Sequence, residues 1–306
     1  MRRLIECVPN FSEGRDVGKV REIAAAIRSG SDVYELGVTM DADHNRSVIT
    51  FAASPASVGE AALRGVKRAA ELIDMNLHHG VHPRIGATDV VPFVPLEGSG
   101  LADCARIARW TAEEIWRRFR IPTYLYEEAA LSAERRNLAA IRRGQFEGLR
   151  REVQEDQNRR PDFGEARLNP TAGATAVGAR KVLIAFNVNL DTEDVEIARD
   201  VARAIRASNG GLACVKAIGL FLASRARAQV SMNLTDYTVT PLDLVFEEVS
   251  KQAKSRGAAV AESEIVGLIP AGALNAISPK RLLIRNFSDD MVLEFRLERA
   301  LAGASR

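Results

Sequence analysis

Residues 47–96, SVITFAASPASVGEAALRGVKRAAELIDMNLHHGVHPRIGATDVVPFVPL, contain the pattern that decides the fold. The apolar run at 47–52 is typical of a strand, and Ser54-Pro55 then opens a helix because proline is favoured in a first turn. A second apolar run at 90–96 again indicates a strand. The stretch therefore predicts a strand, a helix and a strand, with a polar loop at 77–89 ahead of the last strand.

The flanking segments extend this pattern into two halves of similar design. Ahead of residue 47, apolar runs at 3–9 and 33–38 predict strands, and helical spacing at 16–29 predicts a helix. The first half therefore has the order β-α-β-β-α-β of a ferredoxin-like unit. The same order follows downstream, with strands expected at 181–188, 214–222, 228–234 and 259–268, and helices at 192–207, capped by Asp191, and at 241–254.

We therefore expect an α/β (α+β) fold of two ferredoxin-like subdomains with mixed sheets, at 1–179 and 180–306. Further helices are expected at 101–118, at 133–141 and in the tail 271–306, and a short strand at 123–126. The segment 142–180 contains three arginine pairs and turn-rich motifs, so we expect a long irregular connector there. Because ligand sites favour domain junctions, we expect the loop at 77–89 and this connector to line one cleft between the halves.

Composition excludes several function classes. The chain of 306 residues has a formal net charge of only +2 and 6% aromatic residues, which argues against a broad nucleic-acid surface. No apolar run is long enough to span a bilayer, and the N-terminus lacks the features of a signal peptide. The three cysteines are far apart and show neither metal-ligand spacing nor a disulfide framework. We therefore expect a cytoplasmic protein without membrane or nucleic-acid partners.

The loop 77–89 is the candidate for chemistry, because it contains three of the four histidines. Imidazole titrates near neutrality and is suited to proton transfer. His82 is the favoured candidate because Pro83 biases it toward an extended conformation, which can hold its ring in one direction. His78 and His79 follow the end of a helix and are less constrained. A solvated residue or a local hydrogen bond is the alternative interpretation for each.

Short motifs along almost the whole chain are similar to those of one enzyme family. In the first half they are VPNFSEGR at 8–15, DHNRSV at 43–48, HPRIGA at 82–87, YLY at 124–126, RRG at 142–144 and PDFG at 161–164. They continue with GAT at 173–175, GARK at 178–181, LIAFNVN at 183–189, AQVSMN at 228–233 and VGLIP at 266–270. Each motif alone is weak, but their combination resembles the glutamate formiminotransferases, in the stand-alone bacterial form.

The resemblance implies a fold, a reaction and a set of site residues. It implies two α/β subdomains that form a tunnel for folate, a homodimer, and tetrahydrofolate as co-substrate without a metal. The reaction is transfer of the formimino group from N-formimino-L-glutamate to N5 of tetrahydrofolate, in histidine degradation, with His82 acting first as general base and then as general acid. The folate contacts fall on Gly164, Glu165, Ala166, Arg167, Leu168, Asn169, Pro170, Thr171, Ala172 and Gly173.

The charges of the two substrates suggest further binding residues. Both substrates carry carboxylates, which Arg46 and Arg84 could receive through paired hydrogen bonds. A protonated amidine needs a carboxylate, and Asp41, Asp43 and Asp89 are candidates. Many relatives have an acidic residue in a Leu-Asp-Val stretch where this chain has Leu36-Gly37-Val38. If that carboxylate is needed for substrate binding, either Asp41 or Asp43 supplies the charge or the substrate differs.

Three alternatives stay open at the level of sequence. The enzyme could act on 5-formyltetrahydrofolate as a glutamate formyltransferase. The chain could bind folate without turnover. It could also be a metal-dependent hydrolase with His78, His82 and Asp89 as ligands, although Gly80 and Pro83 oppose the continuous helix that would align the two histidines.

Overall fold

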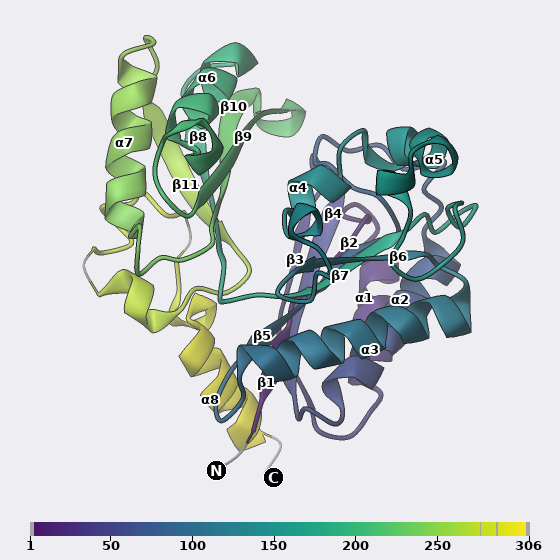
Figure 1. Ribbon diagram of the computed structural model, residues 1–306. Helices are drawn as coiled ribbons and strands as arrows, with labels where there is room; N and C mark the ends of the chain where they lie inside the picture. Colours follow the sequence, from purple (N-terminus) through teal and green to yellow (C-terminus); the bar gives the residue numbers. More distant parts are fainter. Residues whose placement is uncertain (1–2, 276, 286, 304–306) are drawn as a thin grey trace. The chain divides into compact units, whose positions relative to one another are not determined.

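The computed structural model describes residues 3–275, 277–285 and 287–303, and the chain forms two compact units, Met1–Arg180 and Lys181–Arg306 (Figure 1). Each unit has its own core of buried apolar side chains. Each core lies between one sheet and the helices that pack against it. The two units are described separately below.

The first unit is built on a mixed sheet of seven strands. These are β1 (Ile5–Cys7), β2 (Asn10–Phe11), β3 (Val33–Asp41), β4 (Arg46–Ala53), β5 (Thr88–Pro95), β6 (Thr123–Glu127) and β7 (Thr175–Ala179). β1 and β2 lie in line, interrupted at Pro9, and pair antiparallel with both β4 and β5. β3 pairs with the outer side of β4, so the predicted ferredoxin-like order is confirmed in this part of the sheet. β7 and β6 then continue the sheet beyond β5 in parallel.

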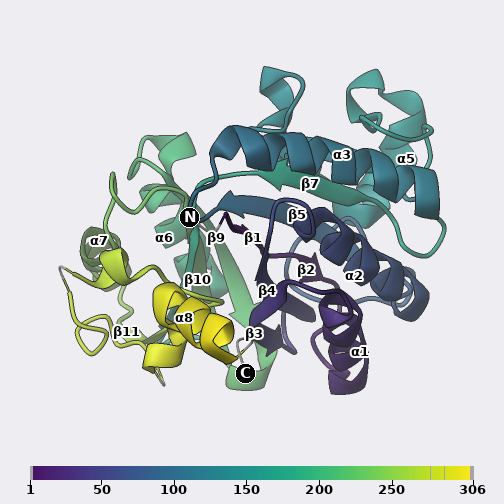
Figure 2. The same cartoon turned by 90° about the horizontal axis from the view of Figure 1, so that it is seen from below.

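Three helices lie side by side on one face of this sheet (Figures 1 and 2). They are α1 (Val17–Arg28), α2 (Val58–Leu72) and α3 (Leu101–Phe119). Two glycines of α2 allow close packing. A Cβ on Gly59 would lie 2.6 Å from the ring of Trp110 in α3, and a Cβ on Gly65 would lie 2.8 Å from Ile27 in α1. The expected helix positions are therefore confirmed, and α2 is the central element of the layer.

The segment 142–180 is not the irregular connector that the sequence suggested. It contains α5 (Gln145–Glu155) and β7, and the whole segment belongs to the first unit. Phe146, Leu149 and Val153 are buried along one side of α5, so its arginines occupy the other faces of an amphipathic helix. β7 is short and consists mostly of small residues, and it is a strand because β5 and β6 pair with both of its edges.

The helix expected at 133–141 is broken into two short pieces. Residues Ala133–Arg135 form a 3-10 turn, η1, and Leu138–Ile141 form α4. Asn137 separates them because its side chain accepts a hydrogen bond from the backbone N of Ala139 and caps α4. A second 3-10 turn, η2 (Gln157–Arg159), follows α5.

The second unit contains a four-stranded antiparallel sheet in the order β11-β8-β10-β9. The strands are β8 (Ile184–Leu190), β9 (Val215–Leu222), β10 (Arg227–Leu234) and β11 (Val260–Val266). The helices α6 (Val195–Ile205) and α7 (Leu242–Lys254) pack on this sheet (Figure 1). This is the predicted ferredoxin-like order, although the sheet is antiparallel throughout.

Two expectations for the second unit need correction. Asp194, not Asp191, caps α6, since its side chain accepts from the backbone N of Glu196, while Asp191 accepts from the backbone N of Ala259. The tail contains one α-helix in its described part, α8 (Leu293–Gly303), beside the turns η5 (Ala271–Leu274) and η6 (Asp289–Met291). The turns η3 (Ala207–Asn209) and η4 (Ala223–Arg225) complete the unit.

Candidate active site

The loop that carries His82 is packed against the turn between β3 and β4. The backbone N of Val81 donates to the carbonyl of Asp43 at 3.1 Å, and the side chain of Asn45 donates to the carbonyl of His79 at 3.0 Å. A Cβ on Gly80 would lie 2.3 Å from the carbonyl oxygen of His44, so only glycine permits this approach. The loop is therefore held in a single position by backbone contacts.

His82 is half-buried and has a defined tautomer. Its Nδ1 lies 2.9 Å from the carbonyl oxygen of Pro83, and its ring centroid is 5.5 Å from that of His44. Because a carbonyl oxygen can only accept, Nδ1 carries the proton and Nε2 keeps its lone pair. Removal from water, with the positive charges of Arg46 and Arg142, holds the pKa of His82 well below its ordinary value. His82 is therefore neutral at pH 7, with Nε2 able to take up a proton.

This lowered pKa can be measured directly. In the folded protein the imidazole C–H resonances of His82 are expected to titrate well below pH 6.5, the ordinary value for histidine. The chain has four histidines, so the spectrum is simple, and the His82→Gln variant assigns the signal by its loss. Titration of that signal at or above about pH 6.5 would contradict the geometry. The urea-unfolded chain provides the reference value.

Beside His82 lies a buried carboxylate held by two arginines, which we name the Asp89 cluster (Asn10, Arg46, Asp89 and Arg142). Asp89 has 0% exposed side chain. Its Oδ2 accepts from Nη1 of Arg46 at 2.7 Å and from Nη2 of Arg142. Arg46 also donates Nε and Nη2 to Oδ1 of Asn10 at 3.0 and 2.7 Å. The cluster joins β2, β4, β5 and the residue that follows α4.

The contacts within the cluster keep Asp89 and Arg46 ionised at pH 7. Burial alone would raise the pKa of Asp89, but the charges of Arg142 and Arg46 lower it below its ordinary value. Burial lowers the pKa of Arg46 to about 10 despite the attraction of Asp89, so Arg46 is still charged at pH 7. Oδ1 of Asp89 also accepts from the backbone N of Ile85 at 3.0 Å, which ties the end of the His82 loop to the cluster.

Arg84 and His78 form a separate, fully engaged network. Arg84 donates Nη1 and Nη2 to the two carboxylate oxygens of Glu147 at 2.8 and 2.6 Å, and Nε to Nδ1 of His78 at 3.1 Å. Nε2 of His78 then donates to the carbonyl of Asn45 at 2.8 Å. The geometry therefore favours a role for Arg84 in anchoring α5 to the loop over direct contact with a substrate.

These contacts also oppose a metal centre of His78, His82 and Asp89. Both ring nitrogens of His78 are engaged by Arg84 and Asn45, and Asp89 is bound by two arginines. In the described part of the chain no group of three or more His, Cys, Asp or Glu side chains is arranged to hold a metal ion.

Asp41 is the last residue of β3, and Asp43 lies in the turn on which the His82 loop packs. Oδ1 of Asp41 accepts from the backbone N of His44 at 2.7 Å, which stabilises the turn. Asp43 is half-buried, and its carbonyl holds Val81. Both residues are thus adjacent to His44 and the loop, which leaves their predicted contact with a substrate as a proposal.

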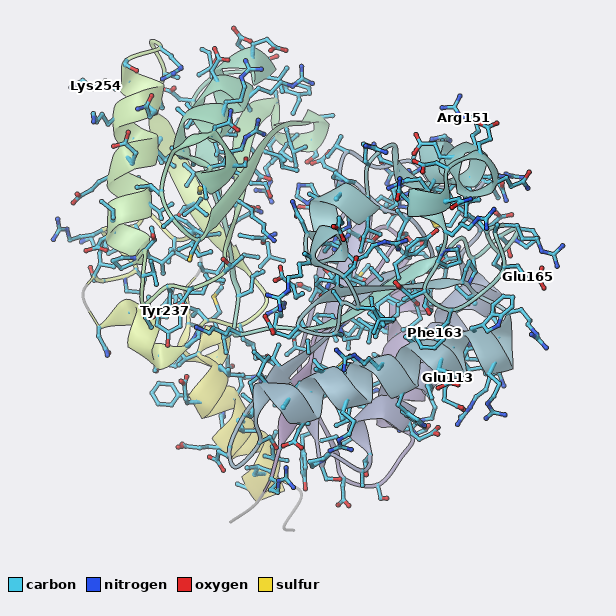
Figure 3. All side chains as sticks on the ribbon, in the orientation of Figure 1. Glu113, Arg151, Phe163, Glu165, Tyr237 and Lys254 are labelled. Atoms are coloured by element: carbon cyan, nitrogen blue, oxygen red, sulfur yellow. The ribbon has the colours of Figure 1, made fainter. Side chains whose placement is uncertain are left out.

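The segment 164–173 divides into an exposed part and a packed part. Gly164, Glu165 and Arg167 are exposed, and the side chain of Glu165 points away from the first unit (Figure 3). From Leu168 onward the chain turns back on itself, since Asn169 and Gly173 exchange two backbone hydrogen bonds of 2.9 and 3.0 Å. The Asn169 side chain accepts from the backbone N of Ala172 inside this turn.

The packed part of this segment is bonded to the His82 loop. Ala87 donates its backbone N to the carbonyl of Ala172 at 2.9 Å, and Ala174 donates to the carbonyl of Ile85 at 3.0 Å. Gly86 and Gly173 face each other in this bridge, and a Cβ on Gly86 would lie 2.1 Å from the carbonyl oxygen of Ala174. The structure thus brings the His82 loop into contact with part of the segment that we expected beside it from the sequence.

Gly86→Ala is expected to disturb this bridge. The added methyl collides with backbone, which cannot give way, so we expect the free energy of unfolding to fall by about 1–3 kcal/mol. Chemical denaturation measures the change. Gly303→Ala is the matched control, because a Cβ there meets nothing within 4 Å and alanine favours a helix. Equal stability of the two variants would show that the bridge tolerates a side chain.

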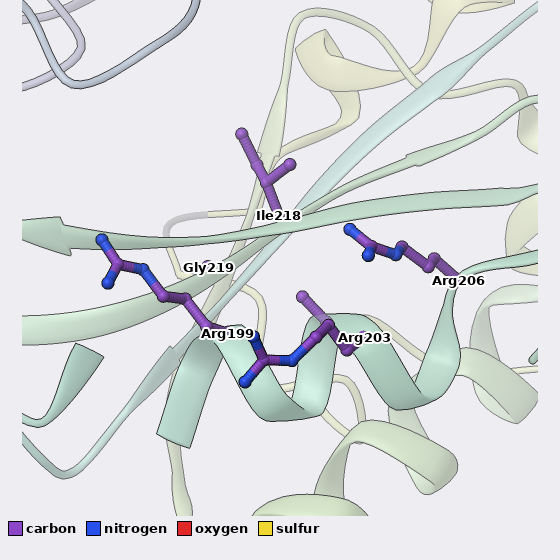
Figure 4. Close-up of a pocket in the computed structure, with 6 residues that line it drawn as sticks. Arg199, Arg203, Arg206, Ile218 and Gly219 are labelled. Atoms are coloured by element: carbon purple, nitrogen blue, oxygen red, sulfur yellow. The ribbon is translucent and has the colours of Figure 1, made fainter. Parts of the chain in front are cut away.

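The second unit contains a hollow of about 240 Å³ that none of the predicted site residues lines (Figure 4). It lies between α6 and β9 and is lined by Arg199, Ala202, Arg203, Arg206, Ile218 and Gly219. Each arginine has a neighbour within its own segment, since Arg199 pairs with Glu196, Arg203 with Asp200, and Arg206 with the side chain of Asn209. Carboxylates of α6 thus balance Arg199 and Arg203, whereas Arg206 is bonded to a neutral amide.

Comparison with known proteins covers both units. The family description "Formiminotransferase domain, N-terminal subdomain" matches residues 4–180, and "Formiminotransferase domain" matches residues 185–284. The chain belongs to the formiminotransferase family. It is 46% identical to a "Glutamate formimidoyltransferase" of Thermoplasma acidophilum over 97% of this chain and 98% of that protein. It is therefore a transferase.

Other members of the formiminotransferase family are similar over comparable lengths. A "Glutamate formimidoyltransferase" of Streptococcus pyogenes serotype M1 is 45% identical over 94% of this chain and 96% of its own length. A "Formimidoyltransferase-cyclodeaminase" of Dictyostelium discoideum is 42% identical over 97% of this chain but only 56% of its own. The resemblance drawn from the motifs is thus confirmed. No helix in the described residues of this family member is long and apolar enough to cross a membrane.

Sequence reasoning missed several residues of the site. Asn10 and Arg142 complete the Asp89 cluster, His44 faces His82, and Glu147 holds Arg84. Arg142 was visible only as one of a basic pair in the RRG motif. The structure separates the pair, because the side chain of Arg142 is 12% exposed and that of Arg143 is 69% exposed. In the sequence of this formiminotransferase, the RRG motif is the signal that could have identified Arg142 as a site residue.

Proposed function

We propose that this enzyme transfers the formimino group from N-formimino-L-glutamate to N5 of tetrahydrofolate, giving 5-formiminotetrahydrofolate and glutamate in histidine degradation. The observation that carries the proposal is a neutral His82 whose Nε2 keeps its lone pair, held in a rigid loop beside two arginines. The similarity to proteins named glutamate formimidoyltransferase, at 45–46% identity over nearly the whole chain, supports the same reaction.

His82 would move one proton twice. N5 of the folate attacks the formimino carbon, and Nε2 of His82 removes the proton that this secondary amine must lose. The imidazolium then gives the proton to the glutamate nitrogen as its bond to the carbon breaks. Because Arg46 and Arg142 disfavour the imidazolium, His82 is a weak base in the first step, and its imidazolium is a strong acid in the second. Nδ1 stays bound to the carbonyl of Pro83 throughout and keeps the ring in place.

The folate would be held by residues 164–173, whose packed part is bonded directly to the His82 loop. Tetrahydrofolate is a co-substrate in this proposal, and the chemistry requires no metal. Asp41 and Asp43 would lie near the amidine, and Arg46 near a carboxylate, whereas Arg84 acts through Glu147. We further propose a cytoplasmic homodimer, as in the family that the motifs resemble.

The test is an assay of the purified chain with tetrahydrofolate and N-formimino-L-glutamate, with and without a chelator. Formation of 5-formiminotetrahydrofolate that survives the chelator supports the proposal. Turnover only with 5-formyltetrahydrofolate and glutamate would replace it by formyl transfer. Tight folate binding without either reaction would make the chain a binding protein, and activity abolished by the chelator would point to a metal-dependent reaction.

A further inference from the structure

The Asp89 cluster has more positive charge than its own residues neutralise. Two guanidinium groups, Arg46 and Arg142, share the single carboxylate of Asp89, and both side chains are only 12% exposed. A buried charge is stable when it is paired and hydrogen-bonded. One carboxylate balances one of the two arginines, so the cluster has a net charge of +1 where it adjoins His82. An anion from outside the protein would complete it.

Arg142 also has a hydrogen-bonding edge that the protein does not use. Its Nε and Nη2 face Oδ1 and Oδ2 of Asp89, whereas Nη1 has no partner among the described residues. Arg46 is more fully engaged, because Asn10 and Asp89 receive all three of its nitrogens. The Asp89 carboxylate thus fixes the plane of the Arg142 guanidinium and leaves its far side available. This is the arrangement that a carboxylate ligand needs.

Two groups near Arg142, Tyr126 and His82, are neutral at pH 7. Tyr126 of β6 is close by, and burial raises its pKa to about 12, so it is a neutral phenol at pH 7. Arg180 is hydrogen-bonded to the same phenol. The ring centroid of His44 lies 5.5 Å from that of His82, and His82 is neutral. Neither of these two side chains supplies a negative charge to the cluster, whose own carboxylate is shared by Arg46 and Arg142.

We propose that Arg142, held by Asp89 beside Arg46, binds the α-carboxylate of the amino-acid donor and is a specificity-determining residue of the enzyme. The inference rests on the proposed function, because it takes the donor to be an N-substituted glutamate. The α-carboxylate of such a donor is attached to the carbon next to the reacting nitrogen. The carboxylates of a folate lie beyond its aminobenzoyl ring, far from N5. A guanidinium beside His82 would therefore contact the α-carboxylate of the donor and not the carboxylates of the folate tail.

The substitution Arg142→Gln tests the proposal without leaving an unpaired buried charge. In that variant Arg46 and Asp89 remain as a balanced pair, and a circular dichroism spectrum and melting curve check the fold. Arg143→Gln is the matched control, because this neighbouring arginine is 69% exposed and lies 3.9 Å from Glu152. Arg142→Lys retains the charge but loses the planar fork.

The expected result is a selective loss of donor affinity. For Arg142→Gln, KM for N-formimino-L-glutamate should rise about 10- to 100-fold, the size of a charge-assisted hydrogen bond, with a smaller change in kcat. KM for tetrahydrofolate should stay within about twofold of wild type. Arg142→Lys should recover part of the loss, and Arg143→Gln should resemble wild type. A rise in KM for folate instead, or no change in either KM, would overturn the inference.

Calorimetric binding of L-glutamate, the product, separates this inference from the proposed function. Wild type and Arg143→Gln should bind it, and Arg142→Gln should bind it at least about tenfold more weakly. L-isoglutamine, whose α-carboxylate is an amide, should bind weakly to all three proteins. If the enzyme uses a formyl donor, this binding pattern is retained although formimino transfer is absent. If glutamate binds equally to Arg142→Gln and wild type, the inference fails even when formimino transfer is observed.

Discussion

His82→Ala is expected to lower kcat for formimino transfer by about 100- to 10,000-fold, the usual contribution of a general acid–base group. The methyl group cannot accept the proton from N5 or return it to the departing nitrogen. KM for both substrates should change much less, because His82 acts on atoms that move during the reaction and not on the bound ground state. Initial-rate kinetics over both substrates separates the two parameters.

His79→Ala is the matched control for this experiment. His79 belongs to the same loop, but its side chain is exposed, and its hydrogen bond with Asn45 is made by the backbone carbonyl. Its removal should leave kcat within about twofold of wild type, because surface substitutions have small effects. If His82→Ala retains wild-type turnover, or if His79→Ala is equally impaired, the assignment of the proton transfer to His82 is wrong.

Asp89→Ala is expected to lower the free energy of unfolding by about 3–5 kcal/mol, the cost of breaking a buried ion pair. The substitution leaves Arg46 and Arg142 buried side by side without a counter-charge, and it removes the acceptor that holds the backbone N of Ile85. Because this bond anchors the His82 loop, activity should fall together with stability. Urea denaturation at pH 7 measures the change.

The pH dependence of stability gives a second readout for Asp89. Its pKa in the folded chain is lowered, so its contribution is fully present above the pKa of the unfolded chain, about 3.9, and is lost as the pH falls through the folded pKa. The difference in stability between wild type and Asp89→Ala should therefore shrink only in acid. Asp200→Ala, on the exposed side of α6, serves as control, and an effect as large as that of Asp89→Ala would contradict the special position of Asp89.

Much of the fold could be predicted because its elements have continuous local signals. The strands β4 and β5 are apolar runs ended by turn residues, and α2 has an apolar face at helical spacing. The signals of α5 and β7 were weaker. Arginine pairs obscured the apolar face of α5, and the small residues of β7 favour a strand only in its place between β5 and β6. There a Cβ on Gly178 would lie 2.5 Å from the ring of Tyr126.

The candidate site was less predictable than the fold, because it depends on contacts between distant residues. His82 could be found from its loop and motif, whereas Arg142 and Arg143 have the same side chain and opposite environments. An aspartate that follows a loop, such as Asp89, looks like any turn residue until two arginines are placed beside it. The charge balance of the cluster is thus a property of the folded chain.

The position of β7 has a consequence for how the chain is synthesised and folded. β6 is complete at residue 127, yet its partner in the sheet is β7, which ends at residue 179. About fifty further residues must therefore be synthesised before β6 can join the sheet. Such non-local parallel pairing forms slowly. We expect a chaperone that binds exposed strand edges to engage the nascent chain in this interval, and a fragment that ends before β7 to leave β6 without its partner strand.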